Sequence, residues 1–127
     1  MKITVVGAGN VGATLAQRLI EKDFADVALV DVVEGISQGK TLDIMQSANV
    51  LGFTHKLVGS NSYDVTAGSD IIVITAGIAR KPGMTRDELI GINAKIVREV
   101  VEKSLALSPD AIFIIVTNPV DAMTYLA

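Results

Sequence analysis

The residues best suited to binding an anion lie near the N-terminus, where glycines fall at positions 7, 9 and 12. An apolar run at 2–6 precedes this G-x-G-x-x-G segment, and a helical pattern follows it. A diphosphate needs a tight turn, a backbone that it can approach closely and the free N–H groups of a helix start. We expect Gly7 to make the turn, Gly9 to leave room for the phosphates and Gly12 to pack closely on the strand.

A carboxylate, Asp31, ends the second apolar run, 19 residues after Gly12. The glycine pattern alone is weak, because many tight turns carry it. A strand before it, a helix after it and an acid at this distance together predict a dinucleotide site in which Asp31 accepts both ribose hydroxyls. Val32 and Val33 follow in place of an arginine. This favours NAD over NADP, because the carboxylate would repel a 2′-phosphate.

Two arginines, Arg80 and Arg86, lie in an irregular segment with Pro82 and Gly83 that leaves the end of a third apolar run. Open parallel sheets bind their ligands at such strand ends. A guanidinium group suits a carboxylate, which it can bind through two parallel hydrogen bonds. The pair indicates an anionic substrate. The alternative is that one or both are solvated loop charges.

Two asparagines and one histidine complete the polar candidates. Asn118 ends the last apolar run, where it either holds a ribose or substrate oxygen or only starts a helix. Asn93 lies on the apolar side of a long helical pattern, where it either faces the cofactor crevice or is a satisfied boundary amide. His55, the only histidine, falls in a weak strand away from the other candidates, and we expect it at the surface.

Strand and helix patterns alternate along the chain and predict an α/β fold, a doubly wound parallel sheet of the Rossmann type. Strands are expected near residues 2–7, 26–31, 55–59, 70–75 and 111–117. Helices are expected at 10–22, at 37–49, from a capping box at 85–88 to residue 108, and after 118, with one helical turn at 63–67. Two βαβαβ halves need six strands. We therefore interpret residues 1–127 as a dinucleotide-binding domain without its sixth strand, with a catalytic domain outside this chain.

Helical periodicity also predicts the buried faces. In the first helix the expected apolar face comprises Val11, Leu15, Ala16, Leu19 and Ile20. In the second it comprises Leu42, Met45 and Ala48. Close packing is expected at Gly39, because a helical glycine costs about 1 kcal/mol relative to alanine. In the long helix the expected face comprises Leu89, Ile92, Ile96, Val97, Val100 and Val101.

Composition narrows the class of protein. Half of the 127 residues are hydrophobic and only 4% are aromatic, which suits an aliphatic core of buried parallel strands. A net charge of −3 without a basic run argues against nucleic-acid binding. No apolar run approaches the roughly 20 residues that cross a bilayer, so no membrane partner is expected. The lack of cysteine fits a cytoplasmic protein. No side chains have metal-ligand spacing, so no metal is expected.

Several segments resemble the malate dehydrogenases of the lactate-dehydrogenase-like branch of the lactate/malate dehydrogenase superfamily. They are G-A-G-N-V-G at 7–12, V-D at 30–31, V-E-G-I-S-Q-G-K-T-L-D at 33–43, A-G-I-A-R-K-P-G-M-T-R at 76–86 and V-T-N-P-V-D at 116–121. The resemblance is collinear over the whole chain, and its specific part is the arginine loop. It implies an NAD-dependent oxidoreductase of the tricarboxylic acid cycle that interconverts L-malate and oxaloacetate. It also implies a homodimer or homotetramer, with the second helix in a subunit interface.

The resemblance implies roles for single residues. Arg80 matches the residue that binds the distal carboxylate of the substrate, and Arg86 matches the one that polarises the reacting carbonyl as the loop closes. Asn118 matches a contact to both substrate and nicotinamide. The other coenzyme contacts that it implies are Gly7, Ala8, Gly9, Asn10, Val11, Gly12, Asp31, Gly77, Asn93, Val116 and Thr117.

The family's proton-exchanging histidine, its partner aspartate and a second carboxylate-binding arginine have no match here, because they fall beyond Ala127. His55 does not match that histidine. We therefore expect residues 1–127 to bind NAD(H) and to turn over malate negligibly. Two alternatives stay open. One is a stand-alone or engineered minimal dinucleotide-binding module without catalysis, and the other is a dehydrogenase of another 2-hydroxy dicarboxylate.

Overall fold

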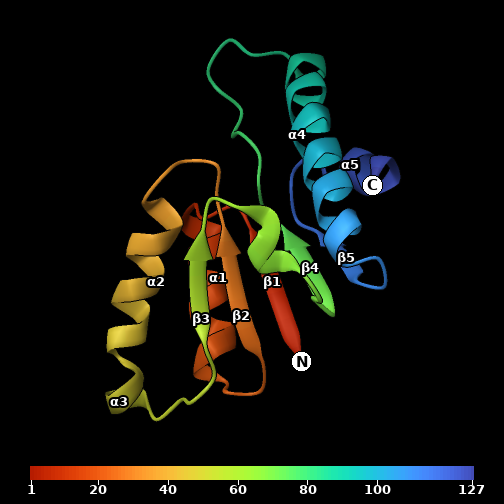
Figure 1. Ribbon diagram of the computed structural model, residues 1–127. Helices are drawn as coiled ribbons and strands as arrows, with labels where there is room; N and C mark the ends of the chain where they lie inside the picture. The colour runs from red at the N-terminus through yellow and green to blue at the C-terminus, as the bar shows by residue number, and fades with distance from the viewer.

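Five strands, all paired in parallel, lie in the order β3-β2-β1-β4-β5 in the computed structural model, which describes residues 1–127 (Figure 1). The strands are β1 (Lys2–Val6), β2 (Asp26–Val30), β3 (Leu57–Ser60), β4 (Ile71–Ile74) and β5 (Ile112–Ile115). The predicted doubly wound parallel sheet is confirmed. Strand ends differ from the prediction by up to two residues, because pairing stops where each loop begins to turn.

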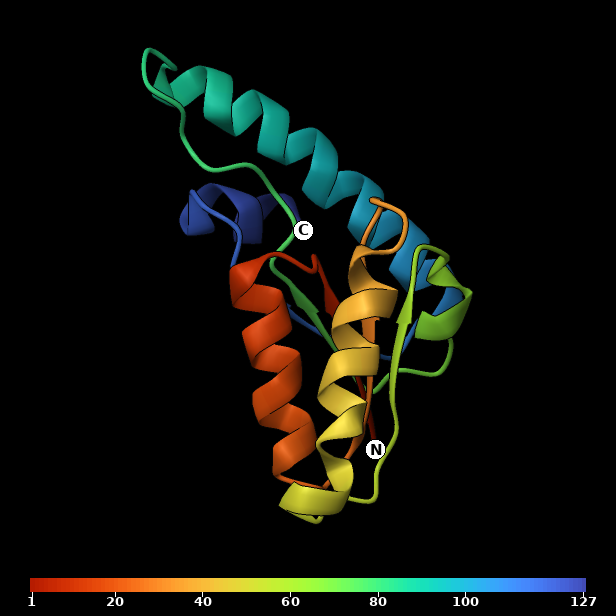
Figure 2. The same cartoon turned by 90° about the vertical axis from the view of Figure 1, so that its left-hand side faces the viewer.

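The helices are α1 (Asn10–Glu21), α2 (Ile36–Gln46), α3 (Ala48–Leu51), α4 (Arg86–Leu107) and α5 (Val120–Leu126), with a 3₁₀ helix, η1, at Tyr63–Thr66. Consecutive strand residues point to opposite faces of the sheet. Accordingly, Val5 packs with Ala16 and Ile20 of α1, whereas Val6 packs with Val97 of α4. Figure 2 shows α1 and α2 side by side over one face, while α4 lies beyond the other.

Helix α1 buries Gly12, Ala16 and Ile20, which confirms the close packing predicted for Gly12 and part of the predicted apolar face. Val11 departs from its predicted face and is 60% exposed. It belongs to the first turn of α1, which extends past the end of β1 and borders a cavity instead of the core.

The prediction for the second helix was wrong in three respects. The helix ends at Gln46, because the Ser47 hydroxyl donates to the carbonyl of Ile44, a local bond that competes with the helical ladder. Leu42 is 63% exposed, whereas Ser37 and Thr41 are buried. Finally, nothing packs near Gly39.

The close approach that was predicted for α2 occurs instead at Gly59 of β3. A Cβ built there would overlap the carbonyl of Ser37 and come within 2.5 Å of the Thr41 hydroxyl. The helix therefore meets the strand through small side chains, which explains why Leu42 faces away from the sheet.

In α4 the buried residues are Leu89, Asn93, Val97, Val100 and Ser104. The predicted apolar face is therefore only partly correct, and Ile92 is 39% exposed. The first turns of α4 and the loop before them extend beyond the strand ends (Figures 1 and 2). The sheet therefore does not cover the apolar side of the first turns of α4.

Candidate functional site

A cavity of about 460 Å³ lies where the chain changes direction across the sheet. From β1 the chain passes to β2 on one side, whereas β4 leads to β5 on the other. The loops after β1 and β4 therefore diverge at the carboxyl edge, and open α/β sheets bind their ligands there. The lining residues come from the ends of β1, β2 and β4, from Tyr63 and from α4.

The three glycines of the first loop have the geometry expected of a phosphate-binding turn. Gly7 has φ +106°, and a Cβ there would lie 2.7 Å from the backbone nitrogen of Ala76. A Cβ on Gly12 would overlap the carbonyl of Gly7. Gly9 has no atom within 4 Å of its Cβ position and borders the cavity, so space is open there. Contact between these residues and a coenzyme stays a prediction.

Helix α1 begins at the cavity without any group that would neutralise its N-terminus. Its N-cap residue is Gly9, no side chain caps it, and its first turn has no acidic residue. The first N–H groups of a helix have no intrahelical partner and carry a partial positive charge. The start of α1, with Asn10 and Val11, is therefore suited to an anion.

Asp31 is held against the glycine loop by two backbone groups. Its Oδ2 accepts a hydrogen bond from the N–H of Ala8 at 2.7 Å, and its Oδ1 accepts one from the N–H of Val33 at 2.9 Å. Each carboxylate oxygen keeps a second lone pair for a hydroxyl donor. The Ala8 N–H, by contrast, is occupied, so any contact of Ala8 with a ligand is by packing.

Lys40 of α2 was missed by the sequence reasoning. Its Nζ donates to the carbonyl of Ala8 at 2.6 Å, so a cation lies on the glycine loop. The G-K-T segment in which it lies follows Asp31 by only a few residues. The proximity of Lys40 to Ala8, however, depends on how α2 packs beside α1, and helical periodicity in the sequence does not predict that packing.

Tyr63 and Glu99 form a second group that the sequence reasoning missed. Both border the first cavity, near Asp31 and Val33. Burial, followed by the negative charges of Glu99 and Asp31, raises the pKa of Tyr63 to about 12. The phenol is therefore neutral at physiological pH. Lys103 lies 5.3 Å from the centre of its ring and bonds Glu99 at 2.6 Å.

A second cavity, of about 440 Å³, shares Thr75, Gly77 and Ile78 with the first. It is bordered by six of the predicted site residues: Val11, Gly77, Arg80, Val116, Thr117 and Asn118. The fold therefore brings an arginine and an amide from two different strand ends to one space. The Arg80 Nε donates to the carbonyl of Met84 at 3.0 Å, a bond within the loop.

Arg86 is separated from this group. It is the first residue of α4, is exposed, and borders neither cavity. The predicted capping box is confirmed next to it, because Thr85 and Glu88 exchange hydrogen bonds. The Thr85 backbone N–H, followed by its hydroxyl, lowers the pKa of Glu88. The box fixes where α4 begins and so where Arg86 lies.

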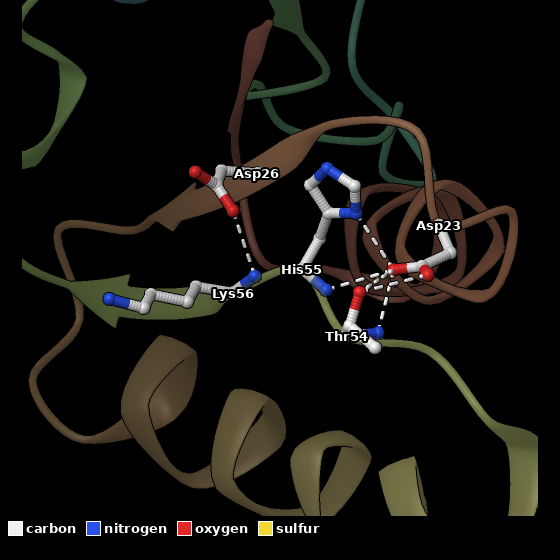
Figure 3. A network of polar contacts seen from close by, with 5 residues as sticks. All are labelled: Asp23, Asp26, Thr54, His55 and Lys56. Atoms are coloured by element: carbon white, nitrogen blue, oxygen red, sulfur yellow. Dashed lines mark hydrogen bonds and ion pairs between the residues drawn. The ribbon is translucent and has the colours of Figure 1, made fainter.

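His55 lies at the opposite edge of the sheet, before the start of β3 (Figure 3). Its backbone N–H and its ring Nδ1 contact Oδ1 of Asp23 at 2.8 and 2.7 Å, and the Thr54 N–H donates to the same oxygen at 2.7 Å. The His55 backbone N–H, then its ring, holds the pKa of Asp23 well below its usual range. This pair joins two turns and is remote from both cavities.

No group of three or more histidine, cysteine or acidic side chains has the arrangement of a metal site. None of the helices combines the length and the apolar character that crossing a bilayer requires.

Comparison with known proteins identifies the fold and its relatives. The family model described as lactate/malate dehydrogenase, NAD binding domain, matches residues 1–127. A malate dehydrogenase of Dehalococcoides mccartyi is 71% identical over 126 residues, which cover 99% of this chain and 41% of that protein. The chain thus spans about two fifths of the length of the curated relatives that it matches.

Two solved structures are similar over nearly the whole chain. The malate dehydrogenase of Archaeoglobus fulgidus in complex with NADH has a TM-score of 0.94 at 42% identity, covering 99% of this chain and 43% of that one. The lactate dehydrogenase of Cryptosporidium parvum, complexed with lactic acid and nicotinamide adenine dinucleotide, has a TM-score of 0.92 at 42% identity, covering 98% and 39%. Enzymes that act on different hydroxy acids thus share this fold.

Proposed function

Because this chain belongs to the lactate/malate dehydrogenase family as its NAD-binding domain, we propose that it is the coenzyme-binding part of an enzyme that interconverts L-malate and oxaloacetate. The observation that carries the choice of substrate is Arg80. It borders the same cavity as Asn118, at the carboxyl edge of the sheet. Once a bound ligand excludes water from this cavity, a guanidinium there is favourable only with an anionic partner, and the second carboxylate of a dicarboxylate supplies one.

Each site residue has a proposed role. Arg80 binds the distal carboxylate of the substrate through its guanidinium fork. Asn118 holds the substrate oxygen and the nicotinamide ribose. Arg86 polarises the reacting carbonyl. Since it lies outside both cavities, this role requires the loop before α4 to move towards the sheet.

The coenzyme is proposed to lie along the carboxyl edge from Asp31 to Asn118. The diphosphate meets Gly9 and the first turn of α1, and Asp31 accepts the ribose hydroxyls. The apolar residues Val32, Val33 and Ile96 suit the flat face of an aromatic base. When bound, NADH supplies the hydride, and the protein supplies orientation and charge.

Reduction of a ketone also needs a proton, and no histidine borders either cavity. The single histidine, His55, is at the far edge of the sheet and is engaged with Asp23. We therefore propose that residues 1–127 alone bind NADH but reduce oxaloacetate negligibly. The proton donor is proposed to belong to a separate catalytic domain.

The proposal is tested by titrating residues 1–127 with NADH and then assaying oxaloacetate reduction with and without the remaining part of the enzyme. Binding without turnover, and turnover restored by the second part, are expected. Failure to bind NADH would contradict the proposal. Binding with no restoration would favour the alternative, a dinucleotide-binding module without catalysis.

A homo-oligomer in the cytoplasm is the proposed state of the whole protein. Three apolar side chains of α2 and α3 are exposed in the single chain: Leu42 by 63%, Val50 by 87% and Leu51 by 53%. Exposed apolar groups of this kind favour association. Light scattering should give the mass of a dimer or tetramer, and a monomeric mass at micromolar concentration would refute this assembly.

A further inference from the structure

Asn93 lies beside the predicted substrate loop, yet its amide is used by the protein's own backbone. The residue is 1% exposed. Its Oδ1 accepts a hydrogen bond from the N–H of Ile78 at 2.9 Å. Its Nδ2 donates to the carbonyl of Ile78 at 3.2 Å and to that of Asn118 at 2.7 Å. Both amide hydrogens are therefore spent, and one acceptor direction as well.

The partners of Asn93 belong to the two strand ends that border the second cavity. Ile78 follows β4 and precedes Arg80 in the loop, whereas Asn118 follows β5. Asn93 itself is on α4, the helix to which this loop returns at Arg86. Its hydrogen bonds therefore close the neck of the loop and tie that neck to Asn118.

The packing around this neck leaves no room for adjustment. A Cβ on Gly77 would lie 2.6 Å from Cγ2 of Thr117 and 3.2 Å from Oδ1 of Asn93. The Thr117 hydroxyl donates to the carbonyl of Ala76 at 2.7 Å, which adds a second tie between the two strand ends. The loop base is thus fixed by hydrogen bonds from two buried residues, Asn93 and Thr117, and buried polar groups are costly to leave unpaired.

We propose that Asn93 is a positioning residue for the substrate loop. It fixes the neck of the loop so that Arg80 and Asn118 stay in register across the second cavity. Any closing motion that keeps Arg80 in place must then pivot beyond it, within residues 81–85. The inference rests on the proposed function, because it assigns Asn93 to the step in which a dicarboxylate is held.

The test measures oxaloacetate reduction by the complete enzyme. It compares Asn93→Ala with the parent protein and uses Ser104→Ala as a matched control. Ser104 is also buried on α4 but has no hydrogen-bond partner for its hydroxyl and lies far from the neck. For Asn93→Ala we expect kcat/KM for oxaloacetate to fall about 100-fold, since misplacement on the order of 1 Å has such an effect. The Kd for NADH should change less than about threefold, and the control should keep parent kinetics.

A rise of more than about tenfold in the Kd for NADH with unchanged kcat would show that Asn93 acts through the coenzyme and not through the loop, and would overturn the proposal. Unchanged kinetics would overturn it as well. Hydrogen exchange of the parent provides a test that needs no variant. The Ile78 amide should be protected without NADH, whereas that of Ala79 should exchange freely. An unprotected Ile78 amide would refute the hydrogen bond by which Asn93 closes the neck of the loop.

These outcomes are separate from failure of the proposed function. If the parent protein reduces no oxaloacetate at all, the malate dehydrogenase assignment fails. The exchange rate of the Ile78 amide would still decide whether Asn93 closes the loop.

Discussion

Arg80 and Arg86 are two cations of one loop, and the structure gives them different surroundings. Arg80 borders the second cavity together with Asn118, whereas Arg86 begins α4 and borders neither cavity. A fixed position suits a residue that selects the substrate in the open state. An outlying position suits one that arrives on closure. Spacing along the chain could not distinguish the two roles.

Replacing Arg80 by glutamine tests the choice of substrate. Arg80→Gln removes the cation that would pair with a second carboxylate, and hydrogen bonds to charged groups are worth about 1.5–3 kcal/mol each. We expect kcat/KM for oxaloacetate to fall at least about 100-fold and that for pyruvate to rise. Lys81→Gln, which removes a neighbouring cation that borders neither cavity, should leave the preference unchanged. An unaltered ratio in Arg80→Gln would remove Arg80 from the site.

Asp31 is the residue on which coenzyme selection depends. Asp31→Ala removes the proposed acceptor of two ribose hydroxyls, so the Kd for NADH should rise at least about tenfold. Discrimination against NADPH should also weaken, because the repelling charge is gone. Fluorescence titration with both coenzymes measures these effects. The melting temperature serves as a control, since Asp31 also holds the Ala8 N–H. Parent-like affinity in a folded variant would disprove the role.

At the scale of elements, the site depends on how closely α1 approaches the end of β1. Gly12 lies in the first turn of α1 against the carbonyl of Gly7, and Thr75 of the adjoining loop lies against both. The backbone at the glycine turn is therefore compressed between two strand ends. Any side chain at position 12 would displace the helix start, and with it the N–H groups proposed to bind a diphosphate.

Two glycine-to-alanine variants separate this contact from helix propensity. Gly12→Ala should lower the free energy of unfolding by about 1–3 kcal/mol through overpacking, and should weaken NADH binding. Gly39→Ala is the matched control, because nothing lies within 4 Å of its Cβ position in α2. It should raise stability by up to about 1 kcal/mol. Urea unfolding measures both. Equal effects at the two sites would contradict the packing argument.

At the scale of the whole molecule, the carboxyl and amino ends of the parallel strands have different roles. The carboxyl edge carries both cavities and the predicted site residues. At the amino edge Asp23, with φ +51°, joins the turn after α1 to the segment before β3 through Thr54 and His55 (Figure 3). The two cavities and the Asp23 contacts therefore lie at opposite ends of the strands, a full strand length apart.

The Asp23 tie should make stability depend on pH. The folded-state pKa of Asp23 is depressed, so its contribution is fully present well above the unfolded value near 3.9 and is lost progressively as pH falls from about 5 towards the much lower folded-state pKa. The urea midpoint of the parent should therefore begin to drop below about pH 5 and continue to drop below about pH 3. In Asp23→Ala the drop should be shallower, whereas Asp43→Ala, at an exposed position of α2, should keep the parent's slope. Identical slopes in all three would refute the tie.

The sequence by itself determined the order of elements, the glycine turn, the position of Asp31 and the Thr85–Glu88 box. All of these rest on periodicity or on hydrogen bonds between near neighbours in the chain, which local residue types specify. The parallel sheet followed from the alternation of strands and helices, and the family followed from the arginine loop.

Only the tertiary structure decided which side chains the cavities bring together. Lys40 reaches Ala8, Asn93 closes the loop at Ile78, and Leu42 faces away from the sheet. Each depends on a contact between elements that are distant in sequence, and such contacts are set by strand order and by how closely helices approach the sheet. The local sequence around a residue does not specify these contacts. The same polar or apolar residue can lie on either side of a helix until another element packs against one side.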